Sequence, residues 1–233
     1  MALAYPRLRT VEPLSPYLPE NLRRGLVLYL WMNEGSGNRV YDLSGNGNHG
    51  TIYGATWTRL ASGKNALYFD GVDDRVLVQH SSSLYLSYDF TLLSWIRLEK
   101  VHPGWYGVID KGRNTQTDFW ILTNKDQQQI LYGTKTDVAF WEVALPAPVK
   151  VWMFYAVGYE GTRAFWSVNG ASKSYSGYLG SRLISTNPLT LGCRTPSSDY
   201  SNVSIGTVLI YNRALSDAEI RALYDLHRGL FVG

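Results

Sequence analysis

Residues 42–50, with the sequence DLSGNGNHG, place a carboxylate, an imidazole, two amides and three glycines side by side. A glycine-rich loop binds phosphate when a Lys followed by Ser or Thr comes next, at the start of a helix. Here His49 and Gly50 are followed by Thr51 and Ile52, a pair typical of a strand. The sequence therefore argues against a phosphate-binding loop.

Calcium binding is the second chemistry open to this stretch. Calcium takes six to eight oxygen ligands from carboxylates, amides and backbone carbonyls. The alternative is that the asparagines and glycines only supply turn conformations, and that residues 70–71 form a hairpin turn. We expect first a turn that joins residues 40–43 to residues 51–53. Calcium is the one cofactor that the sequence suggests, and its ligands would be Asp42, Asn46, Asn48 and Asp70.

The sequence lacks the residue patterns that are typical of hydrolytic enzymes. A Glu-x-Asp-x-x-Glu strand would set two carboxylates about 5 Å apart on one face, as retaining hydrolysis of a glycosidic bond requires. That spacing does not occur in this sequence, where Glu142 is alone on its expected strand and Asp137 lies five residues away at an expected turn. There is no Gly-x-Ser-x-Gly elbow, and the four histidines are scattered rather than paired as zinc ligands. We predict no enzymatic activity and no catalytic residues.

Sugar binding needs exposed aromatic rings beside a few polar groups. Aromatic residues fall in the expected central hairpins, at Trp105, Tyr106, Trp120, Tyr132, Phe140 and Trp141. Most tryptophans of a β-sandwich belong to its core. Trp105 follows Pro103-Gly104 and is the best candidate for an exposed ring. The glycan hypothesis combines the 105–106 turn with loops 111–116 and 124–129, and it names Trp105, Tyr106, Arg113 and Gln128.

Short strands must position these residues. From Gly25 onward, apolar runs alternate with clusters of Gly, Asn, Asp and Ser, which is the pattern of strands and tight turns. The expected strands are residues 26–32, 66–69, 75–79, 90–98, 106–111, 119–123, 129–135, 138–143, 152–159, 163–168, 189–193 and 203–211. So many short strands predict an all-β, two-sheet antiparallel jelly-roll sandwich.

One short C-terminal helix is expected in ALSDAEIRALYDLHRG. Ser216 and Glu219 have the spacing of a capping box. Ile220, Leu223 and Tyr224 then form one apolar face, and Gly229 can end the helix. The helix should lie against the sandwich.

Residues 1–24 form an expected N-terminal arm, separate from a domain at residues 25–233. The arm holds four of the nine prolines, which remove backbone donors and favour extended geometry. It is either a loose terminus or a segment that docks on a partner. The partner hypothesis names Leu8, Val11, Leu14, Tyr17 and Leu18 as the side chains that would be buried.

Length, composition and charge limit the classes of protein to which this chain can belong. A chain of 233 residues fits one large β-sandwich domain. Cys193 is the only cysteine, so no intramolecular disulfide can form. A net charge of +3 is too small to argue for nucleic acid. The first 25 residues lack the apolar core of an export signal, and no stretch has the ~20 apolar residues of a membrane span. We expect a soluble protein kept inside the cell that makes it, with no membrane partner.

Six segments, in this order, resemble a known family. They are LVLYLWMNEGSGNRVYDLSGNGNHGTIYGATW, ALYFDGVDDRVLV, FTLLSWIRL, FWSVNG, PLTLG and IGTVLIYNRALSDAEIRALY. Over residues 26–226 the chain resembles laminin-G-like, concanavalin A-like jelly-roll domains. The resemblance implies two stacked antiparallel sheets and the binding of glycans or proteins, often with a calcium ion. Members occur in adhesins, in enzymes and in phage structural proteins.

One motif departs from the family pattern. Many members have Ile-Asp-Glu-Val or Ile-Asp-Asp-Val where this chain has Ile205-Gly206-Thr207-Val208. Gly206 replaces the acidic residue and weakens the case for a metal ligand there. The Ile-Gly-x-Val variant resembles members found among tailed-phage virion proteins.

The sequence predicts a non-enzymatic virion structural or accessory protein: a decoration, capsid-associated or tail-attachment protein that can also bind host-surface glycans. It would assemble in the host cytoplasm and contact other virion proteins, or further copies of itself, through residues 1–24. It would therefore be an oligomer or part of a larger assembly. The alternative is a carbohydrate-binding or cell-adhesion module unconnected with a virus.

Overall fold

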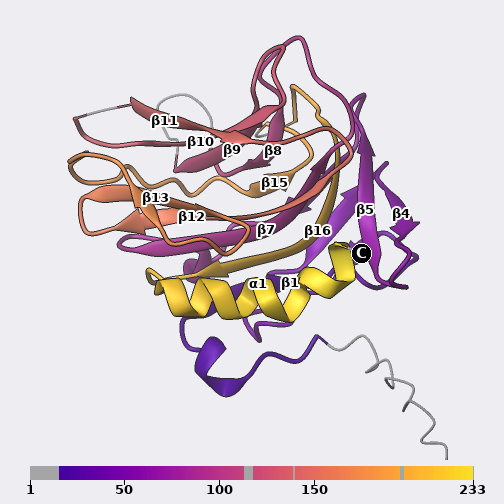
Figure 1. The fold of residues 1–233 in the computed structure, drawn as a ribbon, viewed down its shortest axis with the longest axis horizontal. Coiled ribbons are helices and arrows are strands. Elements are labelled where there is room, and N and C mark those ends of the chain that lie inside the picture. The colour runs from indigo at the N-terminus through magenta and orange to yellow at the C-terminus, as the bar shows by residue number, and fades with distance from the viewer. Residues whose placement is uncertain (1–15, 113–117, 139, 195–196, 233) are drawn as a thin grey trace, which may run out of the picture.

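The computed structural model describes residues 16–112, 118–138, 140–194 and 197–232, which form a sandwich of two antiparallel sheets (Figure 1). The covered sheet, named for the helix on its outer face, has the order β14 (Ser174–Tyr175), β13 (Arg163–Val168), β12 (Trp152–Glu160), β7 (Phe90–Leu98), β16 (Asn202–Tyr211), β5 (Asn65–Asp70) and β4 (Thr56–Arg59), and β1 (Leu26–Leu30) also pairs with β16. The open sheet has the order β11 (Phe140–Pro146), β10 (Gln129–Lys135), β9 (Phe119–Thr123), β8 (Gly107–Asp110), β15 (Leu189–Leu191), β6 (Arg75–Val78), β3 (Gly50–Tyr53) and β2 (Arg39–Val40). The predicted two-sheet jelly roll is confirmed.

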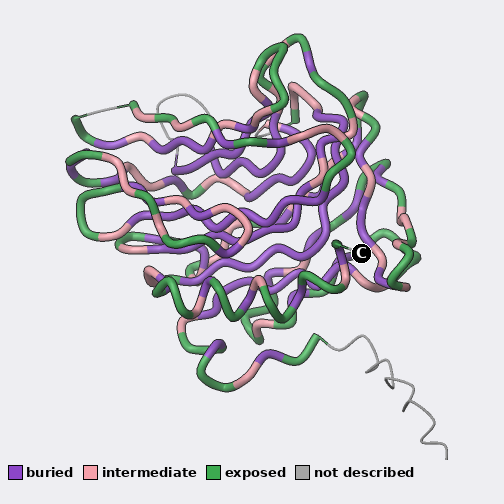
Figure 2. Tube along the Cα trace, in the orientation of Figure 1, coloured by how far each residue is buried: buried purple, intermediate pink, exposed green. Residues whose placement is uncertain are grey.

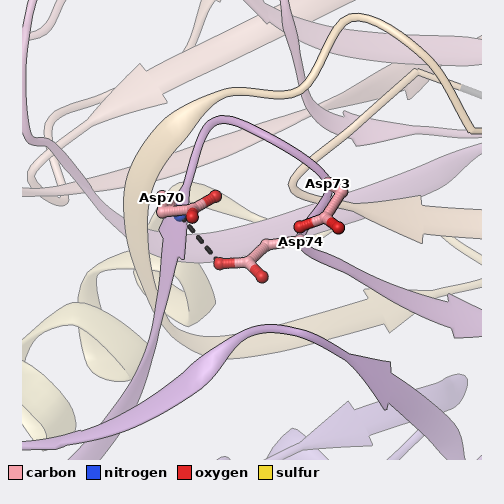
Figure 3. Close-up of side chains that lie close together, drawn as sticks. All are labelled: Asp70, Asp73 and Asp74. Carbon is pink, nitrogen blue, oxygen red and sulfur yellow. Dashed lines mark hydrogen bonds between the residues drawn. The ribbon is translucent and has the colours of Figure 1, made fainter.

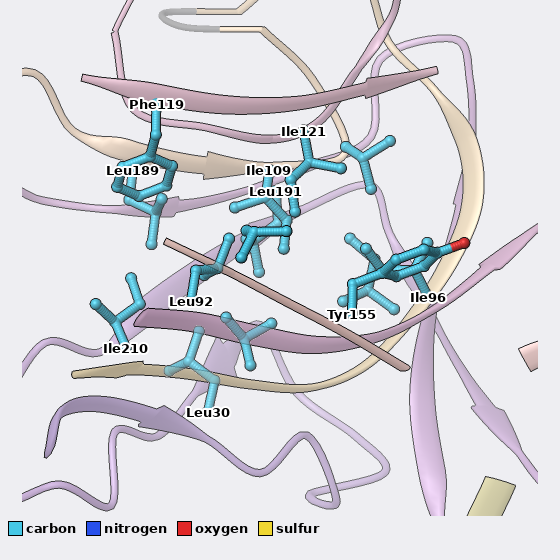
Figure 4. Close-up of a cluster of buried hydrophobic side chains, with 14 of the residues drawn as sticks. Leu30, Leu92, Ile96, Ile109, Phe119, Ile121, Tyr155, Leu189, Leu191 and Ile210 are labelled. Atoms are coloured by element: carbon cyan, nitrogen blue, oxygen red, sulfur yellow. The ribbon is translucent and has the colours of Figure 1, made fainter. Parts of the chain in front are cut away.

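The space between the two sheets is filled by side chains that alternate along the strands (Figure 4). Leu92 and Ile96 of β7 face Ile109 of β8 and Ile121 of β9, and all four are buried. Burying one large apolar side chain stabilises the fold by about 1.5–3 kcal/mol. The alternation of side chains along β7 therefore helps to hold the two layers together.

The covered sheet is buried on its outer face as well. Leu93 and Trp95 of β7 and Phe154 of β12 point away from the first core and belong to a second apolar cluster. Helix α1 (Asp217–Phe231) covers this cluster, with its outward side exposed (Figures 1 and 2). Since β7 and β12 are apolar on both faces, their burial requires this helix.

Helix α1 begins at the predicted capping box. The Ser216 hydroxyl accepts a hydrogen bond from Glu219 N, and the Glu219 carboxylate accepts one from Ser216 N. The helix does not end at Gly229 as expected but continues to Phe231. The Phe231 ring stacks on Trp95 with 4.8 Å between ring centres, and burying this ring favours the extra turn.

Gly206 of β16 lies beneath the end of this helix. A Cβ added at Gly206 would overlap the Phe231 ring and approach Trp95. The glycine that replaces the family's acidic residue therefore makes room for the helix. Among the described residues, no helix has the length and apolar run needed to cross a bilayer.

The described part of the expected arm, residues 16–24, packs on the covered sheet. Leu18 is only 4% exposed and Leu22, the last residue of the short helix η1 (Glu20–Leu22), only 3%, and both belong to the second cluster. The Tyr211 hydroxyl donates to Leu22 O. Leu18, which the partner hypothesis names, is buried by its own domain, whereas Tyr17 is exposed, and partner binding by the arm stays a prediction. Leu8, Val11 and Leu14 lie outside the described residues, and the division at residue 24 stays a prediction.

Candidate functional site

The 42–50 stretch is a turn organised by Asp42. Asp42 Oδ1 accepts hydrogen bonds from Tyr29 N and Ser44 N, both at 2.9 Å. Asp42 Oδ2 accepts from Ser44 Oγ at 2.8 Å and from Asn48 N at 2.9 Å. Asp42 is buried, and both carboxylate oxygens have two donors each. The turn links β2 to β3, where Val40 pairs with Gly50, close to the predicted limits.

The other turn residues are used in the same way. Asn48 Nδ2 donates to Val27 O and to Ser83 Oγ, both at 2.8 Å, and Asn48 Oδ1 accepts from Ser81 Oγ. Asn46 Nδ2 donates to Leu26 O. These bonds tie the turn to β1 and to the short helix η2 (Ser82–Leu84). The geometry supports a structural turn, and Asp42 and Asn48 do not suit calcium because their oxygens already accept protein donors.

Asp70 lies in a different group of carboxylates. Asp70, Asp73 and Asp74 each offer an oxygen within 4.8 Å of the others, in the turn between β5 and β6 (Figure 3). Asp74 Oδ2 accepts from Asp70 N at 2.9 Å, and Asp70 Oδ1 accepts from Val72 N at 2.8 Å. Burial raises the pKa of Asp74, and the neighbouring Asp70 and Asp73 carboxylates add to the rise. Three oxygen donors of this kind are compatible with a hard cation, so calcium binding at Asp70 stays a prediction.

A shallow pocket of about 230 Å³ lies on the outer face of the open sheet. Its lining residues are Trp105, Leu122, Phe140, Glu142 and Arg194. Trp105 is 54% exposed and Phe140 is 67% exposed, although both are large aromatic side chains. The pocket thus combines two accessible rings with a carboxylate and a guanidinium.

Gly133 makes room for an indole that contacts two of the pocket residues, Phe140 and Glu142. Trp120 of β9 pairs with Gly133 of β10, and a Cβ there would overlap the indole. The indole therefore lies across β10, and its Nε1 donates to Glu142 Oε1 of β11 at 2.8 Å. Phe140 stacks on the same indole, with 4.8 Å between ring centres and an interplanar angle of 27°. Gly133 thereby positions both Phe140 and Glu142.

Arg194, which lines the pocket, lies beside the buried Asp110. Arg194 Nε is 3.9 Å from Asp110 Oδ2, and the Arg194 side chain remains 30% exposed. Asp110 is buried on β8 and pairs with Trp120. Since Trp120 pairs with Gly133 and Gly133 with Glu142, the backbones of Asp110 and Glu142 are three strand spacings, or about 14 Å, apart.

The structure brings together only part of the predicted glycan site. Trp105 lines the pocket, whereas Tyr106 packs on His102 with ring centres 4.9 Å apart. Gln128 accepts a hydrogen bond from Val149 N, is exposed, and is not among the lining residues. Arg113 lies outside the described residues. Neither Glu142 nor Arg194 was named for the site, and Phe140 was only one of several aromatic candidates.

Comparison with known proteins gives the family. The sequence model of the concanavalin A-like lectin/glucanases superfamily, Laminin_G_3, matches residues 69–221. The chain belongs to this superfamily. A comparison with curated protein sequences finds no match.

Solved structures show the same fold at low sequence identity. The binding domain of Paraclostridial Mosquitocidal Protein 1 has a TM-score of 0.73 and 16% identity, over 88% of this chain and 53% of that chain. The binding domain of Botulinum Neurotoxin DC, solved in complex with SialylT, has a TM-score of 0.68 and 16% identity, over 88% and 52%. Trypanosoma rangeli sialidase in complex with sialic acid has a TM-score of 0.66 and 18% identity, over 89% and 33%. The chain spans about half the length of these toxin binding domains, and its fold is that of a lectin-like binding domain.

Proposed function

We propose that this chain is a non-enzymatic glycan-binding module and that the pocket at Trp105 and Phe140 holds the sugar. The observation that carries the proposal is the pair of exposed rings beside Glu142 and Arg194. Sugar rings have apolar faces that pack on aromatic side chains, and their hydroxyls bond to carboxylates and guanidinium groups. The superfamily supports the same ligand class, as do two proteins of similar fold, one solved in complex with SialylT and the other in complex with sialic acid.

Binding without hydrolysis fits the carboxylates of the pocket. Glycosidases place two carboxyl groups about 5–9.5 Å apart across the scissile bond. Glu142 is the only acidic residue that lines this pocket among the described residues, and the backbone of the buried Asp110 lies about 14 Å away. The Trp120 indole also fixes Glu142 Oε1 through its hydrogen bond. This arrangement supports recognition of a sugar rather than cleavage of a glycosidic bond.

A glycan array tests the proposal with two variants and a control. Trp105→Ala and Phe140→Ala should each weaken retention of the bound glycan by about tenfold or more, the loss typical of a buried aromatic contact in an interface. Tyr88→Ala is the matched control, because Tyr88 is exposed at 83% and does not line the pocket. Unchanged retention by both pocket variants, with melts equal to that of the wild type, would overturn the proposal.

A place in a virion is a narrower prediction from the sequence. The structure weakens two of the observations behind it, the Ile-Gly-x-Val motif and the apolar arm. Gly206 has a packing role beneath Phe231, which accounts for the Ile-Gly-x-Val motif without reference to a particle. Leu18 packs on its own domain instead of being available to a partner. The proposal of glycan binding therefore does not depend on a virus. Co-sedimentation with assembled particles is the test of the virion prediction.

A further inference from the structure

A second group of exposed side chains lies on the open sheet, on β3, β6 and the end of β2. The Arg39 guanidinium carbon lies 5.4 Å from the centre of the Tyr41 ring, and that of Arg75 lies 4.3 Å from the centre of the Tyr53 ring. Tyr41 is 50% exposed and Tyr53 is 41% exposed. Two guanidinium–aromatic pairs are thus accessible to a ligand.

Strand pairing places this group on the same face as the Trp105 pocket. Directly paired residues point to the same side of a sheet, and successive residues of a strand point to opposite sides. One row of paired residues crosses the open sheet, formed by Arg39, Thr51, Leu77, Thr190, Asp110, Trp120, Gly133 and Glu142. Tyr53 and Arg75 are paired with each other, two residues along β3 and β6 from Thr51 and Leu77. Both arginines therefore share the outer face with Glu142.

The two groups are separated by a distance that suits a chain of several sugar units. Arg75 lies on β6 and Glu142 on β11, and five strand spacings of about 4.8 Å separate these strands, or about 24 Å. Arg194, 30% exposed, lies between them beside Asp110 of β8. A ligand that reaches from one group to the other would pass three guanidinium groups.

Arg39 and Arg75 have unused hydrogen-bonding capacity. Within the described part of the chain, neither forms a salt bridge, and Arg75 meets Asp73 only through the backbone carbonyl, at 3.4 Å. A guanidinium carries five donors in a planar fork that matches a carboxylate or a sulfate. Placing such groups beside exposed tyrosine rings favours an anionic sugar over a neutral one.

We infer that Arg39 and Arg75, with Tyr41 and Tyr53, form a second binding element for the acidic groups of an oligosaccharide that also occupies the Trp105 pocket. The ligand class is an acidic oligosaccharide that carries carboxylate or sulfate groups. The inference rests on the proposed function and specifies its ligand. The two elements bind different parts of one ligand, so each can be removed separately.

The experiment compares acidic oligosaccharides with neutral ones. A chondroitin sulfate hexasaccharide and its desulfated, carboxyl-reduced form are titrated into the wild type and into the Arg39→Gln/Arg75→Gln double variant. We expect the wild type to prefer the acidic form, and the double variant to bind it about 10–100-fold more weakly, the effect of losing hydrogen bonds to charged groups. Arg59→Gln is the control, because Arg59 is an exposed arginine on β4 of the covered sheet.

The outcomes separate this inference from the proposed function. If Trp105→Ala abolishes binding while the double variant and the wild type bind alike, or if the wild type prefers the neutral form, the second element does not exist and the proposed function stands. If the double variant loses binding and Trp105→Ala does not, the pocket assignment fails and the arginine element stands. Tighter binding of single-stranded DNA than of the hexasaccharide, with the same dependence on the two arginines, would replace the glycan by nucleic acid and overturn both.

Discussion

At the scale of single residues, the Asp42 carboxylate accepts four hydrogen bonds in a buried turn. Asparagine would keep one accepting oxygen and put an NH2 group where Oδ2 faces the donors Ser44 Oγ and Asn48 N. We expect Asp42→Asn to lower the free energy of unfolding by about 1.5–3 kcal/mol, the range for hydrogen bonds to a charged group. Urea unfolding followed by circular dichroism measures this change.

The control for Asp42 is Asp126→Asn, since Asp126 is exposed and lies outside the group of carboxylates at Asp70, Asp73 and Asp74. It should change the free energy of unfolding by no more than about 0.5 kcal/mol, as most surface substitutions do. Both variants are unfolded with calcium and with a chelator. A loss in Asp42→Asn that is seen only when calcium is present would show that Asp42 is a metal ligand, contrary to the hydrogen-bonded turn.

Asp74 gives a prediction with a defined pH dependence. Its pKa is raised by burial and by the Asp70 and Asp73 carboxylates, so the folded state holds this proton more tightly than the unfolded chain does. The free energy of unfolding therefore falls as the pH rises above the ordinary value of 3.8. With chelator present, Asp74→Asn should remove this loss and stabilise the protein near neutral pH by up to about 1 kcal/mol, the scale of charge pairs near a surface.

Thermal melts of wild type and Asp74→Asn, with calcium and with chelator, measure the effect. A lower melting temperature for Asp74→Asn under chelator would contradict the assigned repulsion. Calcium that stabilises the wild type and not the variant would place the ion at this hairpin.

At the scale of elements, the alternation of apolar residues was enough to predict the strands that build the core. β7, β9, β10 and β13 lie where the pattern placed them. The short edge strands β4 and β14 were not predicted, because their half-exposed residues have no clear alternation. Helix α1 was predicted from its cap, but its end was not, because Phe231 is fixed by packing on Trp95 and not by local propensity.

The candidate site could be predicted only in part. In FWEVAL the alternation sets Phe140 and Glu142 on one face of β11 and Trp141 on the other. Which face meets the core depends on the opposite sheet, since Trp141 packs against the core and Phe140 stays outside. Trp105 and Tyr106 pose the same question, because the sequence does not tell which of these two successive rings is exposed; the structure exposes Trp105 and packs Tyr106 on His102. Arg194 is far from both in sequence and reaches the pocket only through the pairing of β15 with β8.

The contact between β16 and α1 gives a prediction at this scale. Gly206→Ala should destabilise the fold by about 1–3 kcal/mol, because its Cβ overlaps the Phe231 ring. Phe231→Ala should cost about 3–5 kcal/mol for the lost ring. The double variant should cost at least about 1 kcal/mol less than the sum, because the overlap disappears with the ring. Chemical unfolding of the four proteins gives the coupling energy, and strictly additive losses would contradict this packing.

At the scale of the whole molecule, the two sheets have different roles. The central strands β7, β12 and β16 of the covered sheet are buried on both faces, by the core on one side and by α1 and residues 16–24 on the other (Figure 1). The open sheet has the core on one face only, and its outer face carries the exposed rings and guanidinium groups. From this asymmetry we infer that the covered sheet supports the fold and the open sheet binds the ligand.

Two buried histidines predict how stability responds to acid. Burial lowers the pKa of His227 to about 3, with a smaller effect of Lys64, and burial also lowers the pKa of His102, whose Nε2 accepts from Asn202 N at 2.8 Å. Both are neutral in the fold and become protonated in the unfolded chain below the ordinary value of 6.5. The free energy of unfolding should fall as the pH drops from 6.5 to 5, with a slope that approaches about 1.4 kcal/mol per pH unit for His227, and His102 adds to this fall in the same direction.

His227→Gln should remove the contribution of His227 to the pH dependence of the free energy of unfolding. Urea unfolding at several pH values between 5 and 7 provides the comparison with wild type. A slope that the substitution leaves unchanged would show that His227 is not neutral in the fold.

The central claim is that a glycan binds the outer face of the open sheet, and NMR mapping of the bound state tests it most directly. A glycan retained on the array is titrated into labelled protein while the Trp105 indole N–H, the β9–β11 amides and the Arg194 side chain are followed. The account predicts shifts that concentrate on Trp105, Phe140, Glu142 and Arg194, with α1 and residues 16–24 unaffected. Shifts confined to α1 or to the covered sheet, with Trp105 unchanged at saturation, would contradict it.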